Sequence, residues 1–408
     1  MITDQLDKTK PELIILEKEV ESELGQLLVW WKEHMVDQEK GGFYGRISGH
    51  NMLYKEAEKG VILNTRLLWT FAAAALHTGS ATYEKMADRS FQYLQQYFVD
   101  QEFGGLYWML NAEGQIVQPK KQIYAQAFGI YGLSEYYKLR KQEDALHLAL
   151  ELFDLIEAHS CDAPGSYLEA FQRNWQPIAD FRLSDKDANE AKTMNTHLHI
   201  MEAYTNLYQV YPHEKVRKAL QCLINCFLDK FISLETGHLH LFFDEEWKLM
   251  SDIISYGHDI ECSWLLLEAA EVLGEAALIA RVQPIIMQMA EVTLKEGFDQ
   301  DGGIMYEKAG QHVDKEKHWW VQAEAVVGFL NAYQISQNQV YLQATIRCWD
   351  FIKNTIKDEV YGEWVWSILE DGTINRRADK AGPWKAPYHN GRMCLEVERR
   401  VRLLQGQA

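Results

Sequence analysis

The chain has 408 residues, of which 47% are hydrophobic and 25% are charged, and this composition is typical of a folded globular protein. Its net charge of -18 excludes a basic surface for nucleic acid or an anionic membrane, and no apolar run is long enough to span a bilayer. The N-terminus has no apolar signal region, and the six cysteines include no Cys-x-x-Cys pair. We therefore expect a cytoplasmic protein with reduced cysteines.

Hydrophobic periodicity predicts twelve helices. The first spans residues 11–36 and the last spans residues 387–404, and each has a proline, Pro11 or Pro387, that suits its first turn. Between them, segments that are apolar nearly all round alternate with segments that have one apolar face, as expected for alternating buried and half-exposed helices. The buried helices are predicted at 60–77, 121–138, 191–209, 255–273 and 318–335, and the half-exposed helices at 81–98, 142–159, 213–232, 276–295 and 338–356.

A motif led by glycine and rich in aromatic residues precedes each buried helix. Its copies begin at Gly42, Gly105, Gly165, Gly237, Gly303 and Gly362. The copies recur about every 60 residues, which is the signature of a repeat architecture. Turn sequences such as Asp371-Gly372 predict that each copy forms a short β-hairpin.

Six repeats of one hairpin and two helices predict an all-α fold, the (α/α)6 barrel. In this fold the twelve helices form an inner and an outer ring, with the short β-hairpins on one face. No linker rich in proline or serine divides the chain, so we expect a single catalytic domain over residues 1–408. An open solenoid is the alternative topology. We expect a monomer, although the composition leaves the oligomeric state open.

Unusual polar residues fall near the starts of the predicted inner helices. Because these six helix starts share the hairpin face of the ring, their side chains are predicted to line one pocket. An arginine in an otherwise apolar helix is costly unless it is paired or catalytic. The residues are Asn64 and Arg66, Tyr124 and Gln126, Asn195 and His199, His258 and Glu261, Trp320 and Glu324, and His389, Asn390 and Arg392.

The stretch around His258 carries two groups that can move protons. Ser255 is a predicted N-cap, His258 falls in the first helical turn, and Glu261 lies three residues later on the same face. The helix N-terminus favours a neutral imidazole while Glu261 favours the imidazolium, so we expect the two side chains to meet and His258 to titrate near neutrality. A capping histidine beside a surface glutamate is the structural alternative.

Metal binding is a weaker interpretation of the same residues. His258 with Glu261, and His199 with Asn195, have spacings that metal ligands can adopt, but the chain has no His-Glu-x-x-His run and no cysteine cluster. For His199 alone, a satisfied core histidine is the structural alternative. We therefore expect no metal site.

Five segments around these residues resemble the cellobiose 2-epimerases, a family within the N-acylglucosamine 2-epimerase superfamily. The resemblance extends from about residue 25 to about residue 400, and the motifs are long, ordered and specific. It implies an (α/α)6 barrel, in agreement with the repeats. The segments are residues 64–69, 194–199, 255–261, 319–325 and 382–392.

The resemblance implies reversible epimerisation at C2 of the reducing-end glucose of a β-1,4-linked disaccharide such as cellobiose or lactose, without a cofactor. In the opened sugar the C2 proton lies next to an aldehyde, and its removal leaves a cis-enediolate. Inversion needs acid–base groups on opposite sides of C2, a role that His258 and His389 would fill. Arg66, helped by His199 and Tyr124, would stabilise the developing oxyanion.

The resemblance also implies a set of substrate-binding residues, in which Glu261 orients or tunes His258 and two tryptophans stack on sugar rings. These residues are Tyr124, Asn195, Glu261, Trp320, Glu324 and Trp384.

Other functions remain open at this stage. One is a monosaccharide 2-epimerase on the same scaffold, such as a mannose 2-epimerase. Another is a glycoside hydrolase that uses two of Glu261, Glu324 and Glu363, and a third is a sugar-binding module without activity. The long segment from Gln172 to Asn189 is predicted to be a mobile loop over the pocket that selects substrate length, unless it is packed at the rim.

Overall fold

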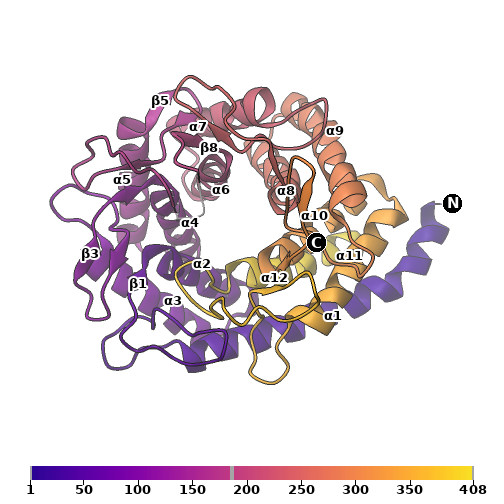
Figure 1. The fold of residues 1–408 in the computed structure, drawn as a ribbon, viewed down its shortest axis with the longest axis horizontal. Helices are drawn as coiled ribbons and strands as arrows, with labels where there is room; N and C mark the ends of the chain where they lie inside the picture. The colour runs from indigo at the N-terminus through magenta and orange to yellow at the C-terminus, as the bar shows by residue number, and fades with distance from the viewer. Residues whose placement is uncertain (1, 184–187, 407–408) are drawn as a thin grey trace.

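The computed structural model describes residues 2–183 and 188–406. Within this part of the chain, twelve α-helices form an inner and an outer ring (Figure 1), so the fold is the predicted (α/α)6 barrel. The inner helices are α2 (Val61–Thr78), α4 (Ile123–Arg140), α6 (Met194–Val210), α8 (Tyr256–Leu273), α10 (Trp319–Ser336) and α12 (Tyr388–Leu404). The outer helices are α1 (Ile2–His34), α3 (Ala81–Tyr93), α5 (Glu143–His159), α7 (Glu214–Cys226), α9 (Ala276–Val292) and α11 (Gln339–Phe351).

The alternation of apolar patterns reflects this arrangement. Every residue of α2 from Val61 to Ala75 is buried, whereas the outer helix α7 buries only one face. Four outer helices end in a π-helical turn. With this turn included, each helix ends within two residues of its predicted end. These turns are η1 (Leu94–Phe98), η2 (Phe227–Phe231), η3 (Thr293–Gly297) and η4 (Ile352–Ile356).

Two details of the helix ends differ from prediction. Helix α1 begins at Ile2, so Pro11 lies inside the helix and not in its first turn. Pro387 is the N-cap residue of α12, one position before the first helical residue. In both cases a proline marked the right region of the chain, but its missing N–H group does not fix the helix start to one residue.

The ring is closed, which excludes the open solenoid. Each inner helix packs against the next, and α12 packs against both α10 and α2. The N-terminal helix α1 packs against α12 and completes the outer ring. None of the described helices combines the length and hydrophobicity that crossing a membrane would require.

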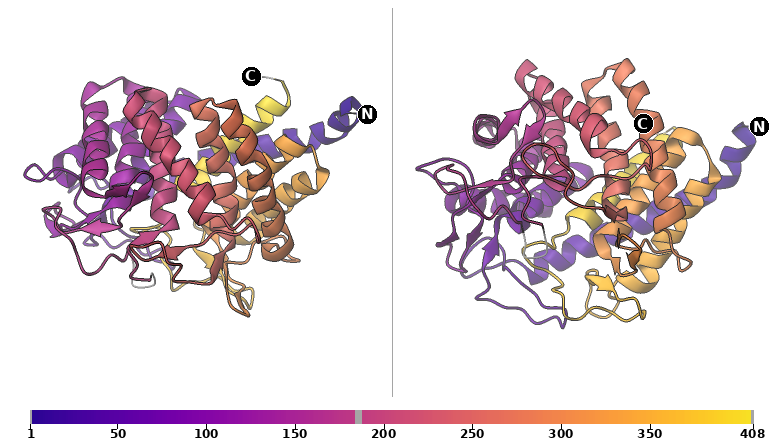
Figure 2. Two further views of the ribbon diagram at one scale, coloured as in Figure 1. Left: turned by 90° about the horizontal axis from the view of Figure 1, so that it is seen from above. Right: turned by 45° about the horizontal axis from the view of Figure 1, so that its top comes forward.

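The hairpins lie together along one face of the ring, the lower edge in the left view of Figure 2. Each forms at the predicted position, and five of the six leading glycines adopt the left-handed backbone that favours glycine, with φ of +60° at Gly42 and +74° at Gly105. In the fifth copy Gly302, and not Gly303, has this conformation. A side chain at Gly105 would also collide with Trp175, because its Cβ would lie 2.8 Å from that ring.

Antiparallel pairing links each repeat to the next. The strand before an inner helix pairs with the hairpin of the following repeat, as Lys59 pairs with Leu110 and Gly60 with Met109. A bridge between Ile47 and Ala381 joins the last repeat to the first. The sheets are β1 (Lys59–Gly60) with β2 (Met109–Leu110) and β3 (Ile116–Gln118), β4 (Lys121–Gln122) with β7 (Ala170–Phe171), β5 (Cys161–Ala163) with β6 (Ser166–Tyr167), β8 (Lys192–Thr193) with β9 (Phe242–Phe243), β10 (Ile253–Ser255) with β11 (Glu307–Ala309) and β12 (His312–Asp314), and β13 (Lys317–His318) with β14 (Ser367–Ile368).

Ion pairs between a lysine and an aspartate recur at the same place in the repeats. The lysine precedes an inner helix, and the aspartate lies at or near the turn that follows an outer helix. The fourth repeat differs, because its turn residue His238 pairs at 2.7 Å with Asp259, which lies within the inner helix α8. The lysine pairs, with their Nζ to carboxylate distances, are Lys59 with Asp37 (2.8 Å), Lys121 with Asp100 (3.0 Å), Lys192 with Asp162 (2.8 Å), Lys317 with Asp299 (2.6 Å) and Lys380 with Asp358 (2.5 Å).

The pair of Lys59 and Asp37 is fully buried, and its loss is expected to destabilise the fold. Replacing Lys59 by methionine leaves the Asp37 carboxylate buried without its cation, which should lower the free energy of unfolding by about 3 kcal/mol. Lys55→Met is the control, because Lys55 is exposed and pairs with exposed Glu39; its expected effect is below about 1 kcal/mol. Urea unfolding followed by tryptophan fluorescence measures both, and equal effects would contradict a stabilising role of the buried pair.

Candidate active site

The candidate site lies where the N-terminal ends of the six inner helices meet the hairpins. Because all six inner helices point the same way, their N-terminal partial positive charges converge on this mouth of the ring and favour negative charge there. Ten side chains were assigned a catalytic or substrate-binding role. Six of them are at least nine-tenths buried: Arg66, Tyr124, His199, Glu261, Glu324 and His389. The other four keep part of their surface exposed: Asn195, His258, Trp320 and Trp384.

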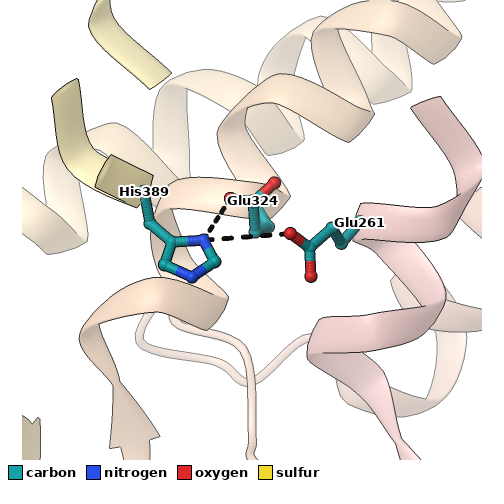
Figure 3. Close-up of side chains that lie close together, drawn as sticks. All are labelled: Glu261, Glu324 and His389. Carbon is teal, nitrogen blue, oxygen red and sulfur yellow. Dashed lines mark hydrogen bonds and ion pairs between the residues drawn. The ribbon is translucent and has the colours of Figure 1, made fainter. Parts of the chain in front are cut away.

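His389 is held by carboxylates (Figure 3). Its Nδ1 lies 2.6 Å from Oε1 of Glu324 and 3.9 Å from Oε1 of Glu261. A carboxylate accepts hydrogen bonds, so Nδ1 carries the proton that it donates to Glu324, and Nε2 on the other side of the ring is left as a base. Burial lowers the pKa of His389 to about 3, despite the opposing influence of Glu324. The imidazole is therefore neutral when no ligand is bound.

Arg392 connects the carboxylates across the ring. One guanidinium nitrogen donates to Oε1 of Glu261 and of Glu324, both at 2.7 Å. The other donates to Glu202 and to the hydroxyl oxygen of Tyr388. Burial opposes ionisation of Glu324, but Arg392 outweighs it and lowers the pKa of this carboxyl. The pKa of Glu261 is raised, because burial and the charge of Glu324 outweigh the same guanidinium.

His199 joins this network from α6. Its Nδ1 donates to Oε2 of Glu202 at 2.8 Å, and Glu202 also accepts a hydrogen bond from the hydroxyl of Tyr388. Burial lowers the pKa of His199. Two of the three predicted histidines are therefore fixed at Nδ1 by carboxylates that share Arg392.

His258 differs from the prediction. Its Nδ1 is hydrogen-bonded to Oγ of Ser255 at 2.8 Å, whereas the Glu261 carboxylate is bonded to Arg392 from α12. The predicted contact between His258 and Glu261 is therefore wrong, because a buried guanidinium attracts a carboxylate more strongly than an imidazole that is neutral. Titration near neutrality is also wrong, since burial lowers the pKa of His258 to about 3. Ser255 is the N-cap residue as predicted, although its side chain does not cap the backbone.

Arg66 lies between aromatic rings. It donates to the backbone oxygen of Trp384 at 2.7 Å and to the hydroxyl oxygen of Tyr124 at 2.8 Å. Its guanidinium carbon is 4.5 Å from the ring centre of Phe128. Its Nε is buried and has no hydrogen-bond partner among the residues that the structure describes. Tyr124 contacts His199 edge to face, so Arg66, Tyr124 and His199 lie together as predicted.

Trp320 contacts both of the histidines assigned to acid–base chemistry. Its ring centre lies 4.8 Å from that of His258 and 5.7 Å from that of His389. Gly257 makes this position possible, because a Cβ there would lie only 2.6 Å from Cη2 of Trp320. The absence of a side chain at Gly257 thus allows the tryptophan to lie over the start of α8.

Trp384 and Asn195 complete the predicted set. Trp384 packs against Tyr124 and against Trp108, a hairpin residue that the sequence did not single out. Asn195 is the second residue of α6, and its Oδ1 has no hydrogen-bond partner within the described parts of the chain. An unpartnered amide oxygen at this mouth is available to a ligand hydroxyl.

One cluster has the spacing of a metal site. Glu261, Glu324 and His389 each offer one ligand atom, and these atoms lie within 4.8 Å of one another. Arg392 already donates to both carboxylates, so its guanidinium supplies the positive charge that a cation would otherwise provide. Full occupation by the arginine disfavours metal binding at this cluster.

The predicted loop from Gln172 to Asn189 is described only in part, because residues 184–187 lie outside the described residues. Its first half is fixed to the rim. Trp175 is buried and donates to the backbone oxygen of Phe103 at 2.8 Å, and Arg173 pairs with Asp100 at 2.9 Å. Trp175 is therefore an anchor and not part of a loose loop, and a role in substrate length stays a prediction for the rest of the segment.

Sequence reasoning missed Glu202 and Tyr388. A signal for Glu202 exists, because it is a carboxylate within an apolar helix, three residues after His199 and on the same face. Tyr388 gave no such signal, since a tyrosine at the start of a buried helix is ordinary core material. Arg392 was noticed as an unusual polar residue, but its three carboxylate partners come from three other helices.

The lowered histidine pKa values lead to a direct spectroscopic prediction. When no ligand is bound, the imidazole ¹⁵N shifts of His258 and His389 should stay those of neutral rings between about pH 8 and pH 5, because burial disfavours the charged form. A change of either site histidine to the shifts of a charged ring within this pH range would contradict burial as the cause.

The comparisons with known proteins agree with this geometry. The family model for N-acylglucosamine 2-epimerase (GlcNAc 2-epimerase) matches residues 42–391. The chain is 51% identical to the cellobiose 2-epimerase of Bacteroides fragilis over 94% of its own length and 98% of that protein. It is 38% identical to a sugar epimerase from a ruminal bacterium, with a TM-score of 0.91 over 94% of this chain and 98% of the other. The cellobiose 2-epimerase of Bacillus thermoamylovorans is also 38% identical, with a TM-score of 0.90 and coverage of 94% and 99%. The chain therefore belongs to the N-acylglucosamine 2-epimerase family.

Proposed function

We propose that this enzyme reversibly epimerises C2 of the reducing-end glucose of β-1,4-linked disaccharides such as cellobiose and lactose, giving the mannose epimer. The observation that carries the proposal is the placement of His258 and His389 on two inner helices, both in contact with Trp320. Its substrate class is supported by the 51% identity to a cellobiose 2-epimerase over nearly the whole chain.

The reaction needs proton transfer on both faces of C2. In the opened sugar, Nε2 of His389 removes the C2 proton, which leaves a cis-enediolate and an imidazolium held by Glu324. His258, after taking a proton from solvent, delivers it to the opposite face and C2 is inverted. His389 then releases its proton to solvent, so the proton count balances. The reverse reaction exchanges the two roles.

The negative charge of the enediolate explains how buried histidines act in this step. In the free enzyme both imidazoles are neutral because burial lowers their pKa. An anion beside them favours the imidazolium and raises the pKa of both rings. Base strength thus increases when the intermediate forms, as general acid–base catalysis requires.

Arg66 would stabilise the enediolate oxygens. It carries a fixed positive charge, is surrounded by aromatic rings, and has a buried Nε without a hydrogen-bond partner in the described chain. A fixed donor in a site that excludes water contributes most where charge develops in the transition state. The converging N-terminal ends of the inner helices carry partial positive charge and also favour the negative charge of the enediolate.

A glycoside hydrolase is disfavoured by the partners of the three candidate carboxylates. Glu261 and Glu324 both accept hydrogen bonds from Arg392, and Glu324 also accepts from Trp264 at 3.0 Å. Glu363 is buried and accepts from Lys385. A hydrolase needs one carboxyl group that protonates the leaving oxygen and a second that faces the sugar, and these side chains are committed to protein donors.

Incubation of the purified protein with cellobiose tests the proposed function. We expect 4-O-β-glucosylmannose as the product, identified by anion-exchange chromatography and NMR. Free glucose would indicate hydrolysis, and an unchanged sugar would contradict catalysis. A parallel incubation with mannose tests the monosaccharide alternative, which would require faster turnover of mannose than of cellobiose.

A further inference from the structure

A cavity lies at the end of the ring opposite the candidate site. It has a volume of about 580 Å³ and lies among the C-terminal halves of α2, α4, α6, α8 and α12. In the left view of Figure 2 this end is the upper side, where the C-terminus lies, away from the hairpins. We call it the rear cavity, and its lining includes Trp69, Tyr131, Asn206, Gln209, Glu268 and Arg399.

The floor of the rear cavity is the back of the candidate site. Glu202, Trp264 and Arg392 line it, and all three hold groups of the site on their other side. Glu202 bonds to His199, while Arg392 and Trp264 donate to Glu324, the carboxylate that holds His389. A molecule in the rear cavity would therefore touch the side chains that position two of the three histidines.

The cations around the rear cavity already have carboxylate partners. Lys138 donates to Glu135 at 2.9 Å, and Arg399 donates to Glu396 at 2.7 Å. Arg402 is paired with Glu398 at 3.0 Å. No free positive charge is thus left in this lining, which disfavours an anionic ligand.

Glu268 is the exception among the acidic residues of the lining. It forms no hydrogen bond or ion pair with any residue that the structure describes. Burial and the neighbouring Glu396 raise the pKa of Glu268 to about 7, although Arg399 and Arg400 oppose this and Glu202 adds to it. A cation beside Glu268 would stabilise the ionised carboxylate, which burial and Glu396 disfavour.

The rest of the rear cavity suits a small polar cation. Five inner helices end around it, and their C-terminal partial negative charges favour positive charge. The stacked rings of Trp69 and Tyr131 form an aromatic wall, with ring centres 5.1 Å apart. Asn206 and Gln209 add amide groups that can bond to hydroxyls.

We propose that the rear cavity binds a small organic ammonium ion that carries hydroxyl groups, with Glu268 as its counter-charge. Binding there also alters the candidate site, because Glu202 and Arg392 belong to both. This coupling rests on the proposed epimerase function. The aromatic wall packs against the carbon skeleton, the ammonium group lies at Glu268, and the amides bind hydroxyls.

Isothermal titration calorimetry with two matched probes tests the binding. Tris is a polyhydroxylated ammonium ion, and pentaerythritol has nearly the same shape without the charge. In phosphate buffer at about pH 7.5, where most of the Glu268 carboxyl is ionised, we expect Tris to bind saturably and pentaerythritol to bind at least tenfold more weakly. Equal affinities, or no saturable binding of Tris, would overturn the proposal.

Two variants locate the site. Glu268→Gln should weaken Tris binding at least tenfold, whereas Glu271→Gln, with the same charge change on the same helix but outside the lining of the rear cavity, should not. Ala73→Phe fills the rear cavity without removing an ion pair and should also abolish binding. This variant keeps the binding site testable if Glu268→Gln does not fold. Unchanged affinity in folded Glu268→Gln or in Ala73→Phe would place the ligand elsewhere and overturn the proposal.

Epimerase assays test the coupling separately. Saturating Tris should change kcat/KM for cellobiose at least twofold in the unsubstituted enzyme and in Glu271→Gln, and have no such effect in Glu268→Gln. The same change in Glu268→Gln would mean that Tris acts at the candidate site itself, and this would contradict the coupling. A protein that binds Tris through Glu268 but never epimerises cellobiose would refute the proposed function and leave the binding site intact.

Discussion

Replacing His389 by asparagine is expected to lower kcat for cellobiose epimerisation on the order of 10⁴-fold. The substitution removes Nε2, the only nitrogen of this ring that is free to accept the C2 proton. The asparagine amide can still donate to Glu324, so the carboxylate is not left without a partner. The loss should therefore appear in turnover and not in folding. Steady-state kinetics and the thermal melting temperature measure the two separately.

His258→Asn should cause a loss of similar size, because each histidine serves one face of C2. His318→Asn is the matched control. His318 is also a buried histidine at the start of an inner helix, but it stacks on Tyr306 and lies outside the candidate site. A folded His389→Asn or His258→Asn enzyme with near wild-type turnover would refute the assignment of that histidine. A loss as large in His318→Asn would mean that the assay reports general disruption.

Replacing Arg392 by methionine is expected to lower the free energy of unfolding by about 5 kcal/mol. The guanidinium is buried and donates to Glu202, Glu261 and Glu324, so its removal leaves three buried carboxylates around an uncharged side chain. Urea unfolding monitored by tryptophan fluorescence measures the change.

Two further variants show whether the geometry or only the charge of Arg392 matters. Arg392→Lys keeps one positive charge but has all its donors on a single nitrogen, whereas Arg392 uses two nitrogens to reach its carboxylates, so an intermediate loss is expected. Arg399→Met removes a half-exposed arginine from the same helix and should cost below about 1 kcal/mol. If Arg392→Met were as stable as Arg399→Met, the carboxylates would not depend on this guanidinium.

The fold was predictable because its signals are local and repeated. The buried pattern of α2 and the one-sided pattern of α7 are properties of single helices. Turn glycines such as Gly105 mark positions where the backbone must adopt a positive φ. With these signals repeated six times, the number of helices follows from the sequence, whereas closure into a ring was distinguished from an open solenoid only by the packing of α12 against α2. The helix starts at Ile2 and Tyr388 did not, because a proline does not by itself mark the first helical residue: Pro11 lies inside α1, and Pro387 precedes α12.

Most members of the candidate site were also predictable, with Glu202 and Tyr388 as exceptions, but their contacts were not. Polar residues at the starts of apolar helices identified His199, His258 and His389 without knowledge of their neighbours. Spacing within one helix then suggested that Glu261 meets His258, whereas the carboxylate bonds to Arg392 from α12, which is separated from α8 by α10 in the inner ring. Such a contact joins residues 131 positions apart, and no pattern within a single helix reports it.

Proton exchange at C2 tests the central claim most directly. The enzyme is incubated with cellobiose in deuterated water, and the hydrogen at C2 of the mannose epimer is analysed by NMR. A histidine exchanges its proton with solvent before delivering it, so we expect the product to carry deuterium at C2 from the first turnovers. Epimerisation that leaves the original hydrogen at C2, with no deuterium incorporated, would contradict proton transfer by His258 and His389.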